Sequence, residues 1–160
     1  MTRRRLTLDS PSGPLTVSED DDAIVRLAWS GTQKASDHSP LLDEAARQLG
    51  AYFAGRRKRF DLPLAPRGSD FQRAVWDQML AIPYGETKSY GELARATGGI
   101  ARAVGTACGA NPIPIFIPCH RVLAADRRLG GFSGGRGPET KALLLALEGA
   151  WPLQHALPLG

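Results

Sequence analysis

The sequence lacks the features that define several common classes of small protein. Two cysteines in 160 residues, Cys108 and Cys119, are too few for a disulfide framework, and neither stands in a paired zinc-ligand spacing. No apolar run approaches the length needed to cross a bilayer, and the arginines at positions 3–5 are not followed by the apolar segment of a secretion signal. We therefore expect a cytoplasmic protein with no metal site and no membrane partner.

Acidic residues are scarce in one long stretch of the second half. Between positions 95 and 136 the only acidic residue is Asp126, whereas the basic residues are Arg95, Arg102, Arg121, Arg127, Arg128 and Arg136. The net charge of the whole chain is +4. Such a stretch is typical of a surface that contacts phosphates, and a solvated basic face has the same composition.

The first part of the chain shows signals of short strands followed by one helix. Apolar alternation within 6–8, 15–17 and 23–29 is interrupted by a turn cluster at 10–14 and an acidic turn at 19–22. Pro40 is suited to open a helix, on which one face is formed by Leu41, Ala45, Leu49 and Phe53. We expect a small antiparallel sheet with a helix, and a boundary in the proline- and glycine-containing stretch at 63–68.

Helix signals dominate after this boundary. Ser69 and Ser89 each precede a glutamine or a glutamate by three residues, which is the capping-box pattern of a helix start. The first of these helices carries Phe71, Val75 and Met79 on one face. The second is short and is broken by glycines at 98–99, and another helix follows from 100 to about 108. The last two form a helix-turn-helix candidate.

The helix from 100 to about 108 combines small residues with one long side chain. Arg102 stands among Ala101, Ala103 and Gly105, although glycine disfavours a helix. The small residues are compatible with tight packing against a neighbouring helix. They are equally compatible with a close approach to a DNA groove, with Arg102 projecting into it.

Three prolines between 112 and 118 exclude a helix there and predict an extended apolar segment that leads to Cys119 and His120. A buried structural role is the common one for a cysteine. Neighbouring side chains in a strand point to opposite faces, so Cys119 and His120 cooperate only if the backbone turns at this point.

The run Ile117-Pro118-Cys119-His120-Arg121-Val122, with Asn111-Pro112 upstream, resembles the active-site signature of the O6-alkylguanine-DNA alkyltransferases. The similarity extends from 71 to 149, through matching segments at 83–85, 89–90, 101–105, 131–135 and 141–149. It implies an α+β fold in which residues 1–66 form a ribonuclease H-like domain. Residues 67–160 would form a mainly helical domain that contains the helix-turn-helix and performs DNA binding and alkyl transfer.

The resemblance assigns catalytic roles to five residues. Cys119 is the nucleophile, His120 accepts its proton through a water, and Glu148 orients His120. Tyr90 donates a proton to the leaving base, and Asn111 holds the turn that places the cysteine. Attack by a cysteine requires its thiolate, so an adjacent base meets a chemical need.

It also assigns residues to the DNA and the base. Arg102 fills the gap left by a flipped nucleotide, and Ala101, Ala103 and Gly105 let their helix approach the narrow minor groove. Ser133 bonds the guanine oxygen, Phe132 forms an apolar wall beside the alkyl group, and Lys141 supports the loop above the pocket. Backbone groups of Cys119 and Val122 read the base edge. Arg121 is expected among the residues that contact DNA.

The implied reaction is a cofactor-free, single transfer from O6-alkylguanine in double-stranded DNA to Cys119 by a monomer. Activity on O4-alkylthymine, the range of alkyl groups and cooperative binding are left open. Four alternatives differ in what they require. A non-catalytic damage-recognition relative lacks the cysteine, and a transcription regulator needs neither His120 nor Glu148. A cysteine hydrolase would turn over without DNA, and a zinc site would use Cys108, Cys119 and His120.

Overall fold

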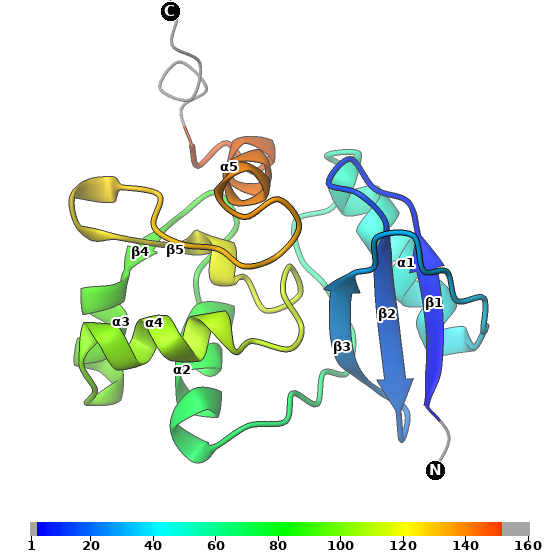
Figure 1. The fold of residues 1–160 in the computed structure, drawn as a ribbon, viewed down its shortest axis with the longest axis horizontal. Coiled ribbons are helices and arrows are strands. Elements are labelled where there is room, and N and C mark those ends of the chain that lie inside the picture. The colour runs from blue at the N-terminus through cyan, green and yellow to red at the C-terminus, as the bar shows by residue number, and fades with distance from the viewer. Residues whose placement is uncertain (1–2, 152–160) are drawn as a thin grey trace, which may run out of the picture. The chain divides into compact units, whose positions relative to one another are not determined.

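The computed structural model describes residues 3–151, and the chain divides into two units (Figure 1). The first unit comprises the chain up to Arg67 together with Pro112–Phe116, and the second comprises Gly68–Asn111 and the chain from Ile117 onward. A three-stranded antiparallel sheet with one helix forms the first unit, and four α-helices dominate the second. The expected α+β fold class is confirmed.

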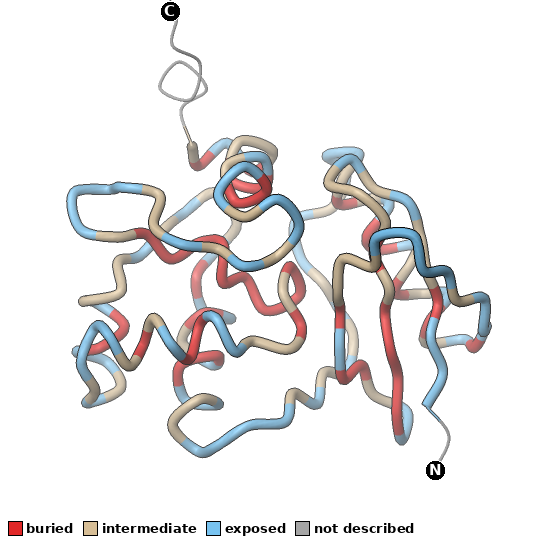
Figure 2. The backbone as a smooth tube through the Cα atoms, viewed as in Figure 1, coloured by how far each residue is buried: buried red, intermediate tan, exposed pale blue. Residues whose placement is uncertain are grey.

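The sheet of the first unit is a simple meander. Strands β1 (Arg4–Leu8), β2 (Leu15–Asp20) and β3 (Ala23–Trp29) lie side by side in chain order, and α1 (Pro40–Phe53) packs against β1 and β2. The β2–β3 turn places Asp21 and Asp22 at positive φ, which aspartate tolerates better than most residues. The middle strand β2 is buried along most of its length (Figure 2).

One detail of α1 differs from the expected pattern. The helix starts at the Ser39 cap, whose side chain accepts a hydrogen bond from Leu42 N, and its buried residues are Leu42, Ala45, Gln48, Leu49 and Tyr52. Leu41 and Phe53, which were expected on this face, are only half-buried. A helix turns by about 100° per residue, so steps of four alone drift around the axis, whereas alternating steps of three and four stay on one side.

The first two helices of the second unit start at the expected capping boxes. Helix α2 (Asp70–Leu80) begins at Ser69 and α3 (Tyr90–Thr97) begins at Ser89, and both reciprocal pairs of hydrogen bonds are present. Gly98 ends α3 with φ of 75°, and α4 (Ala101–Gly109) follows as the second helix of the helix-turn-helix. Trp76 Nε1 donates to Ala107 O at 2.9 Å and so attaches α2 to α4.

The second unit continues after α4 with two short turns, a short strand and a last helix. A 3₁₀ turn (Cys119–Arg121) leads into β5 (Val122–Leu123), which pairs in parallel with β4 (Lys88–Ser89). A second 3₁₀ turn (Ala125–Arg127) and a loop lead to the last helix, α5 (Pro138–Leu147). No helix in the part of the chain that the structure describes is both long and apolar enough to cross a membrane.

The proline-containing segment before Cys119 forms neither helix nor named strand, as its prolines predict. Pro112 O accepts a hydrogen bond from Leu27 N at 2.9 Å, and the Phe116 ring meets the Phe60 ring edge-on with centroids 4.7 Å apart. Ile115 has φ of 74°, a conformation that costs a β-branched residue energy and that the surrounding packing must impose.

Candidate active site

The backbone turns at Cys119, which is the condition for Cys119 and His120 to cooperate. Cys119 N donates to Ile117 O at 2.8 Å, and Arg121 N donates to Pro118 O at 3.0 Å. Asn111 Nδ2 donates to the same Ile117 O at 2.9 Å, so Asn111 ties the end of α4 to the turn. Three consecutive residues with chemically active side chains are therefore held in one 3₁₀ turn instead of an alternating strand.

The Cys119 thiol is buried, with 9% of the residue exposed. Burial raises the pKa of Cys119, while a hydrogen bond from the Asn111 side chain and the positive charge of Lys141 act in the opposite direction. The raised pKa keeps Cys119 in the thiol form at neutral pH. Nucleophilic attack consequently requires a group that removes the thiol proton during the reaction.

His120 and Arg121, the two residues that follow Cys119, form a buried network with Glu148. His120 Nε2 lies 2.7 Å from Glu148 Oε2, and Arg121 donates to the same carboxylate from Nε at 2.8 Å and from Nη2 at 3.0 Å. Arg121 Nη1 donates to Ile82 O at 2.6 Å. Burial alone would raise the pKa of Glu148, but the hydrogen bonds from His120 and Arg121 outweigh it and lower that pKa to about 2.

This network determines which nitrogen of His120 acts as a base. An ionised Glu148 only accepts hydrogen bonds, so His120 Nε2 must carry the proton that it donates. Burial lowers the pKa of His120, against the opposing effect of Glu148, and the ring is therefore neutral at pH 7. Its Nδ1 is then unprotonated, and this atom is buried without a hydrogen-bond partner among residues 3–151. A neutral imidazole with a bare Nδ1 is suited to accept a proton.

Tyr90 reaches the same region through the β4–β5 ladder. Ser89 pairs with Leu123, and Tyr90 is the next residue, at the first turn of α3. Burial, together with the thiols of Cys108 and Cys119, raises the pKa of Tyr90 to about 12. Tyr90 is therefore a proton donor throughout the neutral range. The backbone closes around it at Gly130, where an added Cβ would lie 3.4 Å from Tyr90 Cε2.

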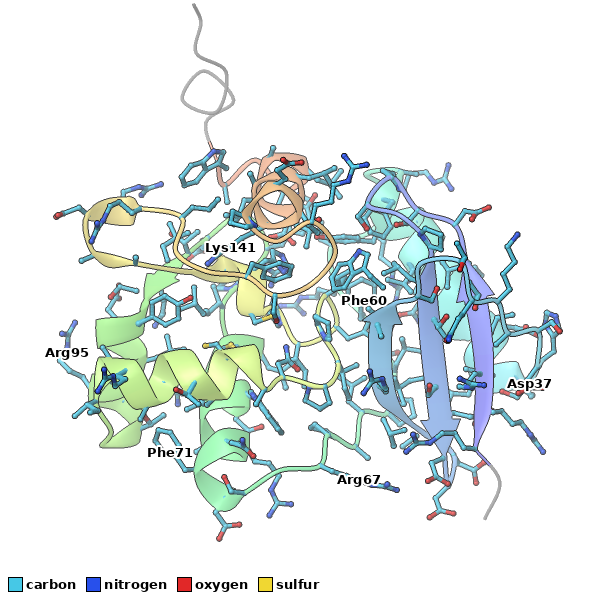
Figure 3. The ribbon with its side chains drawn as sticks, in the orientation of Figure 1. Asp37, Phe60, Arg67, Phe71, Arg95 and Lys141 are labelled. Carbon is cyan, nitrogen blue, oxygen red and sulfur yellow. The ribbon has the colours of Figure 1, made fainter. Side chains whose placement is uncertain are left out.

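Lys141 is a fully buried cation on α5 (Figure 3). Its Nζ donates to Gly131 O at 3.3 Å and lies 5.7 Å from the centroid of the Tyr90 ring. Burial lowers the pKa of Lys141 to about 8, and the two thiols act in the opposite direction. The contact with Gly131 supports the loop in which Phe132 is half-buried and Ser133 is exposed.

Helix α4 exposes some of its small residues and buries others. Val104, Ala107 and Cys108 are buried, whereas Ala101 and Arg102 are exposed. A Cβ added at Gly105 would meet nothing within 4 Å. Packing against a neighbouring helix within the described residues therefore does not explain this glycine. The space over Gly105 is open.

Two family models match the chain. One, described as the DNA-binding domain of 6-O-methylguanine DNA methyltransferase, matches residues 70–150, and the ribonuclease-like domain of the same family matches residues 4–66. This chain belongs to the 6-O-methylguanine-DNA methyltransferase family.

Similar members of the methyltransferase family come from several bacteria. The chain is 43% identical to the constitutive methylated-DNA–protein-cysteine methyltransferase of Bacillus subtilis, over 89% of this chain and 93% of that one. It is 47% identical to the methylated-DNA–protein-cysteine methyltransferase of Mycolicibacterium paratuberculosis, over 89% and 90%. The structure of Mycobacterium tuberculosis OGT in complex with DNA superimposes with a TM-score of 0.82 at 45% identity and covers 96% of this chain and 98% of that one.

The resemblance stated from the sequence is thereby confirmed, but one residue of this methyltransferase lies differently from its expected place. Arg121 was expected to contact DNA. Only 7% of Arg121 is exposed, and its guanidinium is turned inward to Glu148 and Ile82. Its charge is needed there, because a buried carboxylate without a cationic partner is costly. Arg102, the other arginine expected at the DNA, is exposed, as are the remaining arginines of the basic stretch: Arg95, Arg127, Arg128 and Arg136 (Figure 3 labels Arg95).

Two contributions to the site have no signal in the sequence. The first is the backbone carbonyl of Ile82, which accepts a hydrogen bond from Arg121 and lies after α2, where any residue type would supply the same carbonyl. The second is the β4–β5 ladder, which is only two residues long and therefore too short for a strand pattern. Within residues 3–151 no three histidine, cysteine or acidic side chains gather as ligands for a metal ion.

Proposed function

We propose that this protein reverses alkylation of DNA directly, by moving the alkyl group of O6-alkylguanine to Cys119. The observation that carries the proposal is a buried pair formed by His120 and Glu148. His120 is neutral and lies in the same 3₁₀ turn as Cys119, and Glu148 is ionised and lies at the end of α5. The names of similar family members, which are called methylated-DNA–protein-cysteine methyltransferases, also support the proposal.

In the proposed reaction the thiol proton of Cys119 passes to His120 Nδ1, directly or through a water, as the sulfur attacks the alkyl carbon. A bond forms between Sγ and this carbon, and the bond between the carbon and O6 breaks. The electron pair of that bond stays with the guanine, which takes a proton on a ring nitrogen from Tyr90. Guanine is restored without a cofactor, and the proton held by His120 returns to Tyr90 through solvent.

The product on the protein is a thioether, which has no leaving group that water displaces readily. We therefore propose that each molecule reacts once. Ser133 would bond the guanine oxygen and Phe132 would border the alkyl group, since both belong to the loop that Lys141 holds. Asn111 and the backbone of Cys119 and Val122 would complete the pocket.

Access to the base requires it to leave the duplex. We propose that α4 enters the minor groove, where Ala101, Ala103 and Gly105 allow a close approach and Arg102 replaces the flipped nucleotide. The open space over Gly105 and the exposure of Arg102 support this role. Flipping costs a few kcal/mol in a duplex and nothing for a free base. Arg102→Ala should therefore slow repair of a duplex more than reaction with free O6-alkylguanine, and equal slowing would contradict the proposal.

We also propose that residues 67–160 carry the chemistry as one domain and that residues 1–66 form the other. The return of Pro112–Phe116 to the first unit couples the two along the chain. A fragment of 67–160 should then be less stable than the whole protein, because it leaves the Phe116 ring without Phe60.

The decisive test is the intact mass of the protein after mixing with a duplex that contains one O6-methylguanine. We expect a gain of one methylene, about 14 Da, confined to the peptide with Cys119 and ending at one per molecule. Cys108→Ser should react like the wild type, whereas Cys119→Ser should bind DNA and gain nothing. Binding without a mass gain in the wild type would instead identify a damage-recognition protein.

A further inference from the structure

The face of the three-stranded sheet that points away from α1 is hollowed into a concavity of about 830 Å³. Its lining residues all lie between Arg3 and Ala35, so the first unit forms it alone. Strand alternation explains the two faces of the sheet: Leu15, Val17 and Leu27 point into the core, and the residues between them point into the concavity.

The strand register places two arginines on either side of a serine at the floor of this concavity. Arg5 pairs with Ser18, and Ser18 pairs with Arg26, so the three residues form one row across the sheet. The next row consists of Thr7, Thr16 and Ala28. Adjacent strands lie about 5 Å apart, which puts the two arginine backbones about 10 Å from each other. Two guanidinium groups at this spacing can hold a phosphate between them.

The charge of the concavity is uncompensated. Arg3, Arg5, Arg26 and Lys34 line it, and no acidic side chain does. None of these four forms an ion pair in the described part of the chain, whereas Arg4 and Arg67 in the same unit pair with Glu19 and Asp20. The nearby Asp37 accepts a hydrogen bond from the backbone of Arg5 and not from its side chain. Like charges gathered without a counterion repel, and an anion bound among them removes that cost.

Neutral donors complete the surface. Ser30 lines the concavity, and its Oγ is buried without a hydrogen-bond partner among residues 3–151. Gln33, which is exposed, also lines the concavity. A row of cations with hydroxyl and amide donors between them is the combination that proteins use to contact nucleic-acid phosphates.

We propose that this concavity is a second DNA-contact surface that binds the phosphate backbone, separate from the residues that act around Cys119. The choice of DNA as its occupant rests on the proposed function, which brings the protein to DNA, and on the charge complementarity of the concavity. The surface would raise the affinity for DNA of any sequence, because phosphate contacts carry no sequence information.

The test compares three double variants of the full chain in binding to an undamaged duplex at several salt concentrations. Each phosphate contact adds about 0.9 to the slope of log affinity against log salt, so Arg5→Gln with Arg26→Gln should reduce the slope by about 1.8 and weaken binding roughly tenfold at low salt. Arg5→Lys with Arg26→Lys keeps both charges and should keep most of the slope. Arg47→Gln with Arg56→Gln removes the same charge from one exposed position on α1 and one just after it, and should leave the slope unchanged.

Two further readouts separate a binding role from misfolding and from failure of the proposed function. The Arg5→Gln, Arg26→Gln variant should melt at the same or a higher temperature, because repulsion between unpaired cations is relieved, and should react with free O6-benzylguanine at the wild-type rate. A wild-type slope in this variant would overturn the proposal, and so would an equal loss in the α1 variant. If the wild type gains no mass from alkylated DNA, the proposed function fails while the slopes still decide whether this face binds DNA.

Discussion

Glu148 Oε2 lies 2.7 Å from His120 Nε2, and both side chains are fully buried. The carboxylate determines the tautomer of the imidazole, and the tautomer determines that Nδ1 is the basic atom. Arg121 stabilises the ionised carboxylate from the other side. In the proposed reaction these three side chains govern the reactivity of Cys119, although Glu148 lies 28 residues from His120 and 27 residues from Arg121 in the chain.

Replacement of Glu148 by Gln should reduce both stability and activity. The variant leaves Arg121 buried without a countercharge, which typically costs about 3–5 kcal/mol. The His120 tautomer is then no longer imposed, and we expect single-turnover methyl transfer to slow by about 10²-fold. Urea denaturation and quenched-flow mass analysis would measure the two effects. An active variant of wild-type stability would contradict the role of Glu148.

Replacement of Arg121 by Lys distinguishes a positioning role from DNA contact. Lysine keeps the charge but cannot donate two parallel hydrogen bonds, so the pKa of Glu148 should rise. The fall of activity on the acid side should then move to higher pH, with unchanged affinity for undamaged DNA. The exposed Arg95 is a matched control, and its Lys variant should leave the pH profile unaltered. A lower affinity for undamaged DNA in Arg121→Lys, without a shift of the pH profile, would restore the DNA-contact interpretation.

The pH profile of the wild type should show an acid limb below the ordinary histidine range. Burial lowers the pKa of His120 from 6.5, so the neutral, basic form persists as the pH falls through that value. The single-turnover rate at pH 6.5 should remain within about twofold of the rate at pH 7.5. A rate that rises tenfold per pH unit up to pH 9 would mean that Cys119 reacts only as a preformed thiolate.

Acid should destabilise the folded protein in two overlapping ranges. His120 takes up a proton below pH 6.5 in the unfolded chain but not in the folded one, so stability falls as the pH drops below 6.5. Glu148, with its pKa lowered from 4.5 to about 2, contributes stability above pH 4.5 that is lost as the pH falls toward 2. The urea midpoint should therefore decrease from pH 7.5 to 5, and less so in His120→Asn. A urea midpoint that is higher at pH 5 than at pH 7.5 would refute the assignment of a neutral buried His120.

Tyr90→Phe should slow transfer by about 10²-fold with little change in stability, since the ring remains and only the proton donor is lost. The pKa of Tyr90, raised to about 12, means that the wild-type hydroxyl stays protonated from pH 6 to 9. Single-turnover rates of Tyr90→Phe and Tyr84→Phe provide the comparison, because the Tyr84 hydroxyl donates to Leu147 O. Equal effects in the two variants would argue against proton donation by Tyr90.

Much of the fold is readable from the sequence because its signals are local. The serines at 69 and 89 start their helices through bonds to residues three positions away, and Gly98 ends α3 in a conformation that glycine adopts freely. The prolines before Cys119 exclude a helix by themselves. On α1 the expected Ala45 and Leu49 are buried, but Leu42 and Tyr52 take the places of Leu41 and Phe53, because steps of four drift around the helix axis.

The family and the helix-turn-helix could be predicted from the sequence, and so could the candidate nucleophile Cys119, since each depends on residues close together in the chain. The direction of Arg121, the tautomer of His120 and the place of Tyr90 beside β5 depend on contacts between distant segments. Arg121 looks like any other arginine of a basic stretch, and only the packing of α2 and α5 around it supplies the Ile82 carbonyl and the Glu148 carboxylate. A buried charge takes its orientation from the partner that compensates it, and that partner lies far away in the chain.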